Sequence, residues 1–376
     1  MLEVSAFACL AAWLVLLFAR DGFWRQDQRL GEREPSRTPP VIAIVPARNE
    51  AATVVACLEA LSAQDYPGEL TVLLVDDGSD DATNELARGV AERSLRPIRV
   101  LAAPPKPPGW SGKIAAQEAG LDALEGLSPA PSWLWLTDAD IVHGPDVLRR
   151  LVGEALARRV DLASTMVRLS TRNAVERWLA PAFVYFFQLL YPFRAVNDPA
   201  RGVAAAAGGC ILVDHAKLRA AGGFAPIADQ LIDDIALARL IRARGGRLWL
   251  GLNHASHSVR GYDFGAFANM VARTAFTELR HSYPRLVISL LGLSLVFVAP
   301  WALLVLADEA GRLAALAACV LMLWSYVPTV RAYGLPQLWV ATLPVAAVAY
   351  MGMTLLSAWR HARGAGAAWR GRTYAG

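Results

Sequence analysis

The stretch Trp133-Leu-Trp-Leu-Thr-Asp-Ala-Asp140 places an apolar run directly before two carboxylates. Residues 133–137 read as a buried strand, so Asp138 and Asp140 follow its end. Acids at positions i and i+2 of an extended chain point the same way, which lets both reach one ion. Oxygen ligands suit a hard divalent cation, Mg²⁺ or Mn²⁺, which also binds phosphorylated substrates. An isolated pair of this kind is more often a solvated turn, so its interpretation depends on the rest of the chain.

The composition indicates membrane segments around a soluble middle. Of the 376 residues 55% are hydrophobic, with a mean hydropathy of +0.33, against about 45–50% in soluble domains. The excess lies at the start and in the last quarter. Basic residues follow the first apolar run rather than precede it, which predicts an uncleaved anchor whose next segment is cytoplasmic. Three later segments can each span a bilayer: Leu286–Ala307, Leu313–Val330 and Leu338–Trp359.

The orientation of the C-terminus stays open at this point. Three spans after a cytoplasmic domain would put the tail outside the cell. The tail, however, carries arginines that favour the inside: Arg360, Arg363, Arg370 and Arg372. Either one segment is re-entrant or interfacial, or the tail departs from the tendency.

Charge and cysteine usage exclude several classes of protein. The net charge is +4, and no basic stripe with interleaved aromatic residues predicts a nucleic-acid partner. The four cysteines are scattered and form no Cys-x-x-Cys pair, which argues against a disulfide framework or a zinc site. This usage fits a reducing, cytosolic setting for the soluble part.

Between the apolar ends, short apolar runs alternate with amphipathic stretches. Such alternation predicts an α/β domain with a mostly parallel sheet, in which ligands gather at the carboxyl ends of the strands. The expected strands are Val41–Val45, Leu70–Val75, Ile98–Leu101, Trp133–Thr137, Leu162–Met166 and Ile211–Val213. The expected helices are Thr53–Ala63, Ala82–Glu92, Lys113–Leu124, Pro145–Arg158 and Ile235–Ala243. His254 and His257 are expected in a loop.

The resulting division has five parts. We expect an anchor at 1–20, a linker at 21–40, a cytoplasmic domain at 41–285, membrane segments at 286–360 and a basic tail at 361–376. Residues 174–196 are too short and too aromatic to span comfortably. They read as an interfacial helix or, equally, as an ordinary buried helix.

Polar residues follow the first two strands. Asp76 and Asp77 come directly after a buried strand, where adjacent acids are costly without a partner and can accept from a ribose hydroxyl or a base N–H. The segment Pro46–Glu50 ends the first strand similarly, and its polar groups can meet a nucleotide. Asn49 or Glu50 could instead simply begin the next helix.

Three later features could carry chemistry. Lys113 lies beside a helix N-terminus, where phosphate is favoured, although a lone lysine is usually a surface charge. Asp233 and Asp234 open a helix. Asp233 is expected as an N-cap, and the helix end is expected to lower the pKa of Asp234 so that its carboxylate can take a proton from a hydroxyl. The glycines at 208–209 permit close approach of a substrate.

In this order the segments 44–50, 75–79, 138–140 and 233–234 resemble family-2 glycosyltransferases, over about residues 41–276. The loop Gly109-Trp-Ser-Gly-Lys113, the terminal spans and the segment Arg273–Phe276 look like the subgroup that glycosylates membrane lipids. That subgroup includes ceramide, carotenoid and hopanoid-associated glycosyltransferases, and the last is the nearest resemblance. The implied fold is a Rossmann-like A-type glycosyltransferase domain with one N-terminal and about three C-terminal transmembrane helices.

The resemblance also implies roles. Acids matching Asp76 and Asp77 contact the nucleoside, Asp140 with Asp138 holds the metal, and Asp234 is the base of an inverting transfer. The candidate donor-binding residues are Pro46, Ala47, Arg48, Glu50, Asp76, Asp77, Lys113 and Asp138. The candidate catalytic residues are Asp233, Asp234 and Arg273, and the candidate acceptor contacts are Trp178, Gly208, Gly209 and Cys210.

One departure bears on the product. Many family members carry Gln-x-x-Arg-Trp where this chain has Met270-Val-Ala-Arg-Thr274, so the arginine is kept and the tryptophan is not. In processive synthases that tryptophan lies near the acceptor sugar, so its absence argues for addition of a single sugar. We therefore expect transfer from a nucleotide sugar, most simply a UDP-sugar, to a membrane lipid such as a hopanoid. A polyprenyl phosphate acceptor, or a non-catalytic nucleotide-sugar-binding membrane partner, is the alternative.

Overall fold

The computed structural model describes residues 1–125, 130–364, 368–369 and 372–373. Within it the chain forms two compact units. The sheet unit contains residues 28–169 and 195–260. The helical unit contains residues 1–27, 170–194 and 261–376.

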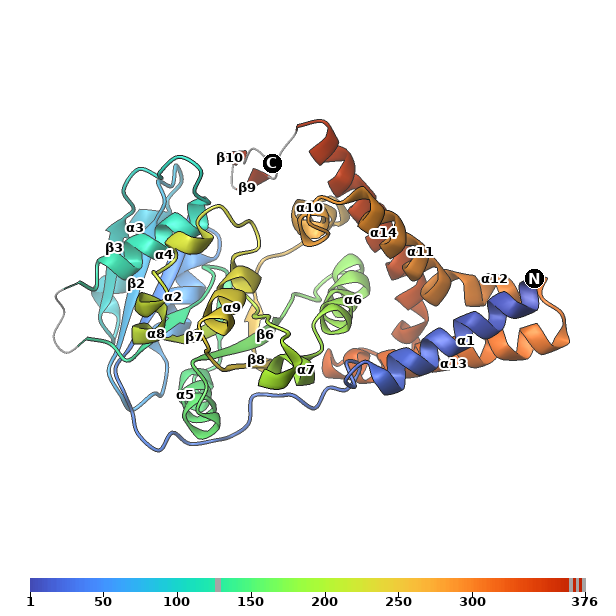
Figure 1. Ribbon diagram of the computed structural model, residues 1–376. Helices are drawn as coiled ribbons and strands as arrows, with labels where there is room; N and C mark the ends of the chain where they lie inside the picture. The colour runs from blue at the N-terminus through green and yellow to red at the C-terminus, as the bar shows by residue number, and fades with distance from the viewer. Residues whose placement is uncertain (126–129, 365–367, 370–371, 374–376) are drawn as a thin grey trace. The chain divides into compact units, whose positions relative to one another are not determined.

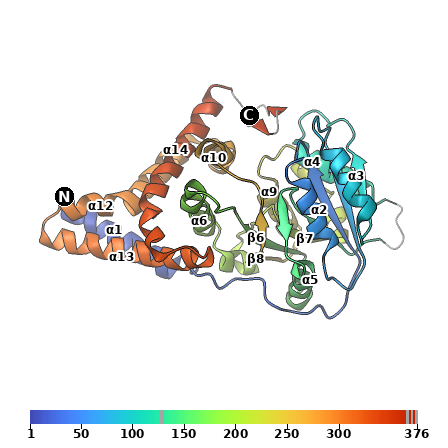
Figure 2. The same ribbon diagram turned by 180° about the vertical axis from the view of Figure 1, so that it is seen from behind.

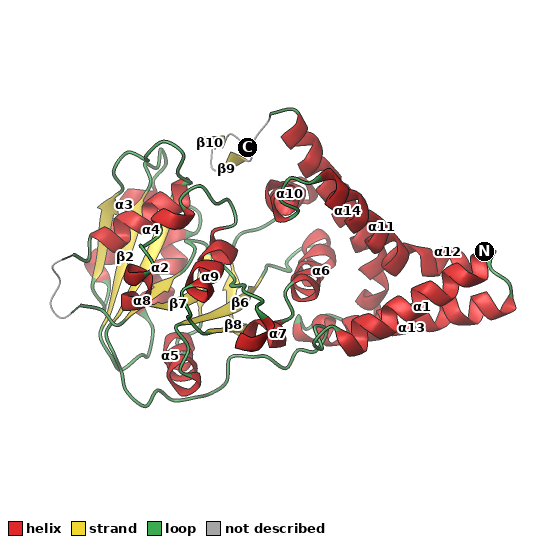
Figure 3. Ribbon diagram, in the orientation of Figure 1, coloured by secondary structure: helices red, strands yellow, loops and turns green. Residues whose placement is uncertain are grey.

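The sheet unit is built on one eight-stranded mixed sheet (Figures 1 and 3). Its strand order is β3-β2-β1-β4-β7-β6-β8-β5. The bounds are β1 (Val41–Ala47), β2 (Leu70–Asp76), β3 (Ile98–Ala102), β4 (Trp133–Leu136), β5 (Ile141–His143), β6 (Leu162–Arg168), β7 (Ile211–Asp214) and β8 (Leu248–Ser258). Strands β3, β2, β1 and β4 run parallel, as does the pair β6 and β8, whereas β7 and β5 run antiparallel to their neighbours. The predicted mostly parallel sheet is confirmed.

All six predicted strands are present, and two further strands of this sheet, β5 and β8, were missed. Strand β5 has only three residues, too few for a periodic signal. Strand β8 starts apolar but continues through Asn253, His254 and His257, so the second half lacks an apolar pattern. The prediction of a loop at the two histidines is therefore wrong. Pairing with β6 and β5 extends the strand through polar residues.

Six described helices of this unit surround the sheet, and a glycine lets one of them, α4, come especially close to it. They are α2 (Val54–Ser62), α3 (Thr83–Arg93), α4 (Gly112–Asp122), α5 (Val147–Arg158), α8 (His215–Ala220) and α9 (Asp233–Ala243), with short turns η1 (Pro199–Arg201) and η2 (Ala225–Ile227). A Cβ at Gly120 of α4 would lie 2.8 Å from Cγ2 of Ile44 in β1, closer than such atoms pack. Helix α4 is thus seated directly on the sheet, which fixes the position of Lys113 in its first turn.

Among its described residues, the helical unit holds four helical segments long and apolar enough to cross a bilayer: Leu2–Ala19, Tyr283–Leu306, Glu309–Ala332 and Gln337–Ala362. They comprise α1 (Leu2–Ala19), then α11 (Tyr283–Leu293), the π-helical turn η3 (Ser294–Val298) and α12 (Ala299–Leu306), then α13 (Glu309–Ala332), and finally η4 (Gln337–Thr342) with α14 (Leu343–Ala362). Helices α1 and α13 lie side by side in both views (Figures 1 and 2). The prediction of one N-terminal and three C-terminal segments is confirmed.

The remaining elements of this unit are shorter. They are α6 (Ala174–Leu190), α10 (Phe264–Glu278) and the two-residue strands β9 (Ala368–Trp369) and β10 (Arg372–Thr373); α7 (Phe193–Asn197) lies where the chain passes into the sheet unit. Helix α6 packs one face on α13 and α14. The Tyr185 hydroxyl lies 2.7 Å from that of Ser325, and the Tyr350 hydroxyl donates to the Leu179 carbonyl at 3.0 Å.

A buried carboxylate in α6 joins the segment before α6 to the segment before α10. Glu176 is 1% exposed and forms a capping box with Asn173. Its Oε2 accepts from the Ser170 hydroxyl at 2.8 Å and the Arg172 N–H at 2.6 Å, and its Oε1 accepts from the Tyr262 N–H at 2.7 Å. Burial alone would raise the pKa of Glu176, but these bonds outweigh it and hold the pKa below its ordinary value.

We expect Glu176→Gln to lower the free energy of unfolding by about 1–3 kcal/mol, because an amide NH₂ would face a buried N–H that now has an acceptor. Thermal and denaturant unfolding of the detergent-solubilised protein measures this change. The same substitution at the exposed Glu92 is the control and should leave stability unchanged. Equal stability of the two variants would contradict a structural role for the Glu176 carboxylate.

Candidate functional site

The sheet topology brings the chemistry-bearing residues to one edge. The residues that follow β1, β2 and β4 lie at the carboxyl ends of parallel strands. Strand β7 runs antiparallel to β4, so the residues before β7 reach the same edge. Strand β8 is parallel to β6, which is antiparallel to β7, so the end of β8 also lies there.

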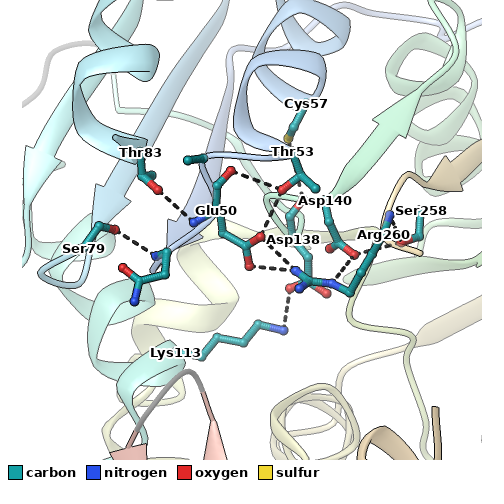
Figure 4. Close-up of polar contacts among 12 residues, drawn as sticks. Glu50, Thr53, Cys57, Ser79, Thr83, Lys113, Asp138, Asp140, Ser258 and Arg260 are labelled. Atoms are coloured by element: carbon teal, nitrogen blue, oxygen red, sulfur yellow. Dashed lines mark hydrogen bonds and ion pairs between the residues drawn. The ribbon is translucent and has the colours of Figure 1, made fainter. Parts of the chain in front are cut away.

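Both carboxylates of Asp138-Ala-Asp140 are held by basic side chains (Figure 4). Lys113 Nζ lies 2.7 Å from Asp138 Oδ1. Arg260 Nε lies 3.0 Å from Asp140 Oδ2, which also accepts from the Ser258 hydroxyl at 2.8 Å. Burial raises the pKa of Asp138; Lys113 opposes that rise, and the charges of Asp140 and Asp233 add to it.

Arg260 is a site residue that sequence reasoning missed. Its second guanidinium nitrogen donates to both oxygens of Glu50, at 2.8 and 2.9 Å. Glu50 is 7% exposed, and it also accepts from the Thr53 hydroxyl at 2.9 Å. Arg260 thus ties Glu50, in the loop after β1, to Asp140 of the acid pair after β4. No local pattern marks it, because its partners lie 120 and 210 positions away in the chain.

The acid pair fits a divalent cation only together with a ligand that supplies further oxygens. Asp138 Oδ2 and Asp140 Oδ1 take no part in the bonds described above, so two carboxylate oxygens can face an ion. Among the described residues, no group of three or more His, Cys, Asp or Glu side chains could hold a metal. Mg²⁺ in particular is commonly held by one or two carboxylates plus substrate phosphates. The donor set therefore suits a cation that arrives with a phosphorylated substrate.

Lys113 also reaches the acids that open α9. Its Nζ lies 3.0 Å from Asp233 Oδ2, so one ammonium joins the end of β4 to the start of α9. Burial alone would lower the pKa of Lys113, but the charges of Asp138, Asp233 and Asp234 outweigh it and hold the pKa above its ordinary value. The sequence singled out Lys113 for its place at a helix start, whereas the structure adds its two carboxylate partners.

Two expectations for the acids of α9 are wrong. Asp233 is not the N-cap, because it is the first residue of α9 and the N-cap position belongs to Ile232, which makes no side-chain cap. The Asp233 carboxylate instead forms an ion pair with Lys113. Asp234 accepts from the N–H groups of Ile235 at 2.7 Å and Gly208 at 2.9 Å. Its pKa is nevertheless raised, to about 7, by burial first and by the charge of Asp233 second. These two effects exceed the lowering by Lys113 and the backbone donors.

The turn before β7 packs directly on these charges. A Cβ at Gly208 would lie 3.3 Å from Lys113 Nζ and 3.4 Å from Asp234 Oδ2. A Cβ at Gly209 would lie 2.9 Å from Val167 Cγ2, too close to be accommodated. Cys210 is fully buried, and its sulfur accepts from the Trp135 indole N–H at 3.4 Å, so it supports the turn from inside.

A buried chain of hydrogen bonds fixes the same turn. The Thr137 hydroxyl donates to the Gly209 carbonyl at 3.0 Å and lies 2.8 Å from His143 Nε2, whose Nδ1 lies 2.8 Å from the Ser256 hydroxyl. Asn253 donates to that hydroxyl at 2.7 Å. The Gly209 carbonyl can only accept, so the single hydroxyl proton of Thr137 goes to it, and the Thr137 oxygen accepts from His143 Nε2. The proton of His143 therefore lies on Nε2, and its Nδ1 accepts from the Ser256 hydroxyl. Burial, with a contribution from His257, lowers the pKa of His143 to about 3, so the ring is neutral.

Asp76 closes the turn after β2. Its Oδ1 accepts from the N–H and hydroxyl of Ser79 at 3.1 and 2.5 Å, and its Oδ2 accepts from Asn84 at 3.3 Å. These are the partners that its burial requires. Asp77 is 4% exposed and donates its N–H to the Ala47 carbonyl at 2.9 Å.

Arg48 binds the backbone of the same turn. Its guanidinium donates to the carbonyl oxygens of Asp77 and, at 3.0 Å, Gly78. Pro46 and Ala47 lie buried within β1. The residues predicted at the ends of β1 and β2 are thus brought together, with Arg48 joining the two strand ends.

Trp178 and Arg273 belong to the helical unit. The Trp178 ring stacks on Phe264 with centroids 6.2 Å apart. Trp178 also lines an open, wholly apolar groove of about 350 Å³ with Ala341, Thr342 and Val345. Arg273 lies in α10, and its buried Nε has no hydrogen-bond partner among the described residues.

Three known glycosyltransferases are similar to parts of the chain. An N-acetylglucosaminyltransferase of Mesorhizobium japonicum is 35% identical over 38% of this chain and 31% of its own length. Glycosyltransferase AglE of Haloferax volcanii is 31% identical over 38% of this chain and 45% of its own. Dodecaprenyl-phosphate galacturonate synthase of Rhizobium johnstonii is 30% identical over 35% and 37%. The chain therefore covers less than half the length of each of these relatives.

The fold also occurs in a solved structure. A mannosyltransferase from Pyrobaculum calidifontis, solved with GDP-mannose and Mn²⁺, superposes with a TM-score of 0.56 at 21% identity, over 94% of this chain and 99% of its own. The glycosyltransferase resemblance seen in the sequence is confirmed, although the matching family carries the number 21 rather than 2. The profile of that family matches residues 4–375. The chain belongs to glycosyl transferase family 21 and is a glycosyltransferase.

Proposed function

We propose that this protein transfers one sugar from a nucleotide sugar to a hydroxyl group of a membrane lipid, with inversion at the anomeric carbon. The observation that carries the proposal is the grouping at one sheet edge of the acid pair Asp138 and Asp140, the bridging Lys113 and the half-buried Asp234. The grouping supplies a place for a diphosphate beside a carboxylate that can accept a proton.

The donor site would use the ends of the first strands. Asp138 and Asp140 would hold a divalent cation, which when bound would neutralise charge on the departing diphosphate. Lys113 would pair with the diphosphate at the start of α4. Asp76 and Asp77 would contact the nucleoside. A UDP-sugar is the proposed donor on the resemblance of these motifs, while the superposed mannosyltransferase was solved with GDP-mannose.

Asp234 would act as the general base. Its carboxylate takes the proton of the acceptor hydroxyl as that oxygen bonds to the anomeric carbon. The bond from this carbon to the diphosphate breaks in the same step, and the nucleoside diphosphate leaves. A pKa of about 7 puts the carboxylate near the optimum for this role at physiological pH.

The acceptor would enter from the bilayer. The four candidate spans and the apolar groove beside Trp178 favour a molecule with a large apolar part. On the resemblance of the sequence, Arg273 would contribute to catalysis. A hopanoid acceptor rests on the resemblance of sequence alone.

The catalytic face would be cytoplasmic. Arginines follow the first span, at Arg20, Arg25, Arg29 and Arg33, and such residues favour the cytoplasmic side. The four described cysteines are free, which agrees with a reducing compartment.

A polyprenyl phosphate is the second candidate acceptor. The observation that favours it is the 30% identity to a dodecaprenyl-phosphate galacturonate synthase. Purified protein offered one lipid class at a time, with a labelled donor, separates the two. A product that releases sugar under mild acid, as a glycosyl phosphate does, would favour the phosphate acceptor.

We expect Asp234→Asn to reduce transfer roughly 10²–10⁴-fold while leaving nucleotide binding intact, because only the proton acceptor is lost. Lipid mass spectrometry of cells carrying wild-type or variant protein should show a species, one sugar heavier than its precursor, only with the wild type. Asp229→Asn, an exposed acid before the same helix, is the matched control. Undiminished transfer by Asp234→Asn would refute the base. Tight nucleotide binding without transfer by the wild type would favour the non-catalytic alternative.

The pH dependence should report the same group. Because the Asp234 pKa is raised to about 7, we expect kcat/KM to fall as pH drops below about 7 and to level off above it. Asp233→Asn removes the second cause of that rise, so the acid limb should move to lower pH. The pH profile of kcat/KM for the two proteins measures this shift. A limb that stays in place or moves upward would contradict the assignment.

We expect Asp140→Ala to weaken nucleotide-sugar binding in the presence of Mn²⁺ by on the order of tenfold or more, since one of two metal carboxylates is lost. Titration calorimetry with and without Mn²⁺ measures the loss. Asp146→Ala, a partly exposed acid after β5, is the control. Identical affinities of the wild type with Mn²⁺ and with a chelator would count against the metal site.

A further inference from the structure

The two basic residues on the acid pair are held in different ways. Arg260 donates three hydrogen bonds to two carboxylates, one to Asp140 and one to each carboxylate oxygen of Glu50. Its planar fork is fixed by this geometry, and the Ser258 hydroxyl beside it binds the same oxygen of Asp140. Arg260 is therefore a permanent part of the site.

Lys113 has no comparable clamp. A single ammonium at the end of a flexible four-carbon stem is shared between Asp138, at 2.7 Å, and Asp233, at 3.0 Å. Its side chain keeps 17% of its surface exposed, and that of Asp138 keeps 35%. The pair can therefore be reached from solvent and separated without unfolding any element.

A divalent cation arriving alone would meet an unfavourable arrangement. Asp138 is already ion-paired with Lys113, and Asp140 is ion-paired with Arg260. To bind Asp138, the ion would have to lie close to the positively charged Lys113 ammonium or displace this ammonium from Asp138. Both cost free energy, because the displaced ammonium would have no new anion to bind. A diphosphate that arrives with the ion supplies that anion, because phosphate oxygens can accept the ammonium that leaves Asp138.

We propose that Lys113 is a resident counter-ion of the donor site, which occupies Asp138 and Asp233 in the empty protein and transfers to the diphosphate when a metal–diphosphate complex binds. The proposal rests on the donor site of the proposed function and concerns the order in which its parts assemble. It makes metal and diphosphate bind together, with little affinity for the metal alone. Lys113 therefore acts as a specificity element that admits the metal only with its substrate.

The test compares Lys113→Met with the wild type in full-length, detergent-solubilised protein. Mn²⁺ binding is measured by electron paramagnetic resonance of the free ion, first alone and then with UDP or GDP. We expect Lys113→Met to gain affinity for Mn²⁺ alone by on the order of tenfold, because Asp138 loses a competing charge. The same variant should lose affinity for the nucleotide in the presence of Mn²⁺ by a similar factor.

Lys217→Met is the matched control. Lys217 is a half-exposed lysine of the sheet unit, 3.8 Å from Asp161, and its loss should change neither affinity. The double variant Lys113→Met with Asp233→Asn removes one uncompensated acid and guards against failure to fold. It should keep the gain for Mn²⁺ alone.

The test depends on the two affinities of Lys113→Met changing in opposite directions, with tighter binding of Mn²⁺ alone and weaker binding of the nucleotide. An unchanged or weaker Kd for Mn²⁺ alone in both Lys113 variants would overturn the proposal. Absence of Mn²⁺ binding from every protein, even with nucleotide, would contradict the metal site itself. Failure to glycosylate any lipid, with the two opposite shifts present, would overturn only the proposed acceptor.

Discussion

The repulsion among carboxylates at one edge of a sheet is the constraint on which the rest of this site depends. Asp138, Asp140, Asp233, Asp234 and Glu50 gather at that edge, and buried like charges cannot all stay ionised without compensation. Arg260 binds Glu50 and Asp140, and Lys113 binds Asp138 and Asp233. Asp234 receives two backbone N–H groups and no ion pair among the described contacts, and its pKa is the one raised to about 7. The unequal distribution of compensation thus distinguishes Asp234, which has only backbone donors, from the acids that form ion pairs.

The topology makes this gathering possible. Parallel strands present their carboxyl ends at one edge, and the antiparallel β7 returns the Gly208–Gly209 turn to it. Gly120 seats α4 on β1, which sets the Lys113 stem against the end of β4. The glycines of the turn then leave the narrow space in which Lys113 and Asp234 lie. Close backbone approach at Gly208 therefore shapes the surroundings of Lys113 and Asp234.

The helical unit follows different physics. Its four candidate spans among the described residues are apolar enough for a bilayer, and several polar side chains of this unit pair across distant parts of the chain. Gln26 binds both Gln188 and Thr329, and Tyr185 binds Ser325, which joins α6 to α13. Hydrogen bonds of this kind specify the packing of helices where lipid removes the hydrophobic drive between them.

The sequence by itself determined the elements whose signals are local. A few neighbouring residues suffice to read the apolar runs of buried strands, the length of the spans and the polar residues at the ends of β1, β2 and β4. These signals predicted the fold class and most candidate residues. Tertiary structure alone decided the pairing of those charges. Arg260 meets its partners across 120 and 210 positions, β8 continues through polar residues because β5 and β6 pair with it, and burial reverses the pKa expected for Asp234 at a helix start. Desolvation and ion pairing depend on what lies nearby in space, and neighbouring positions in a chain do not contain that information.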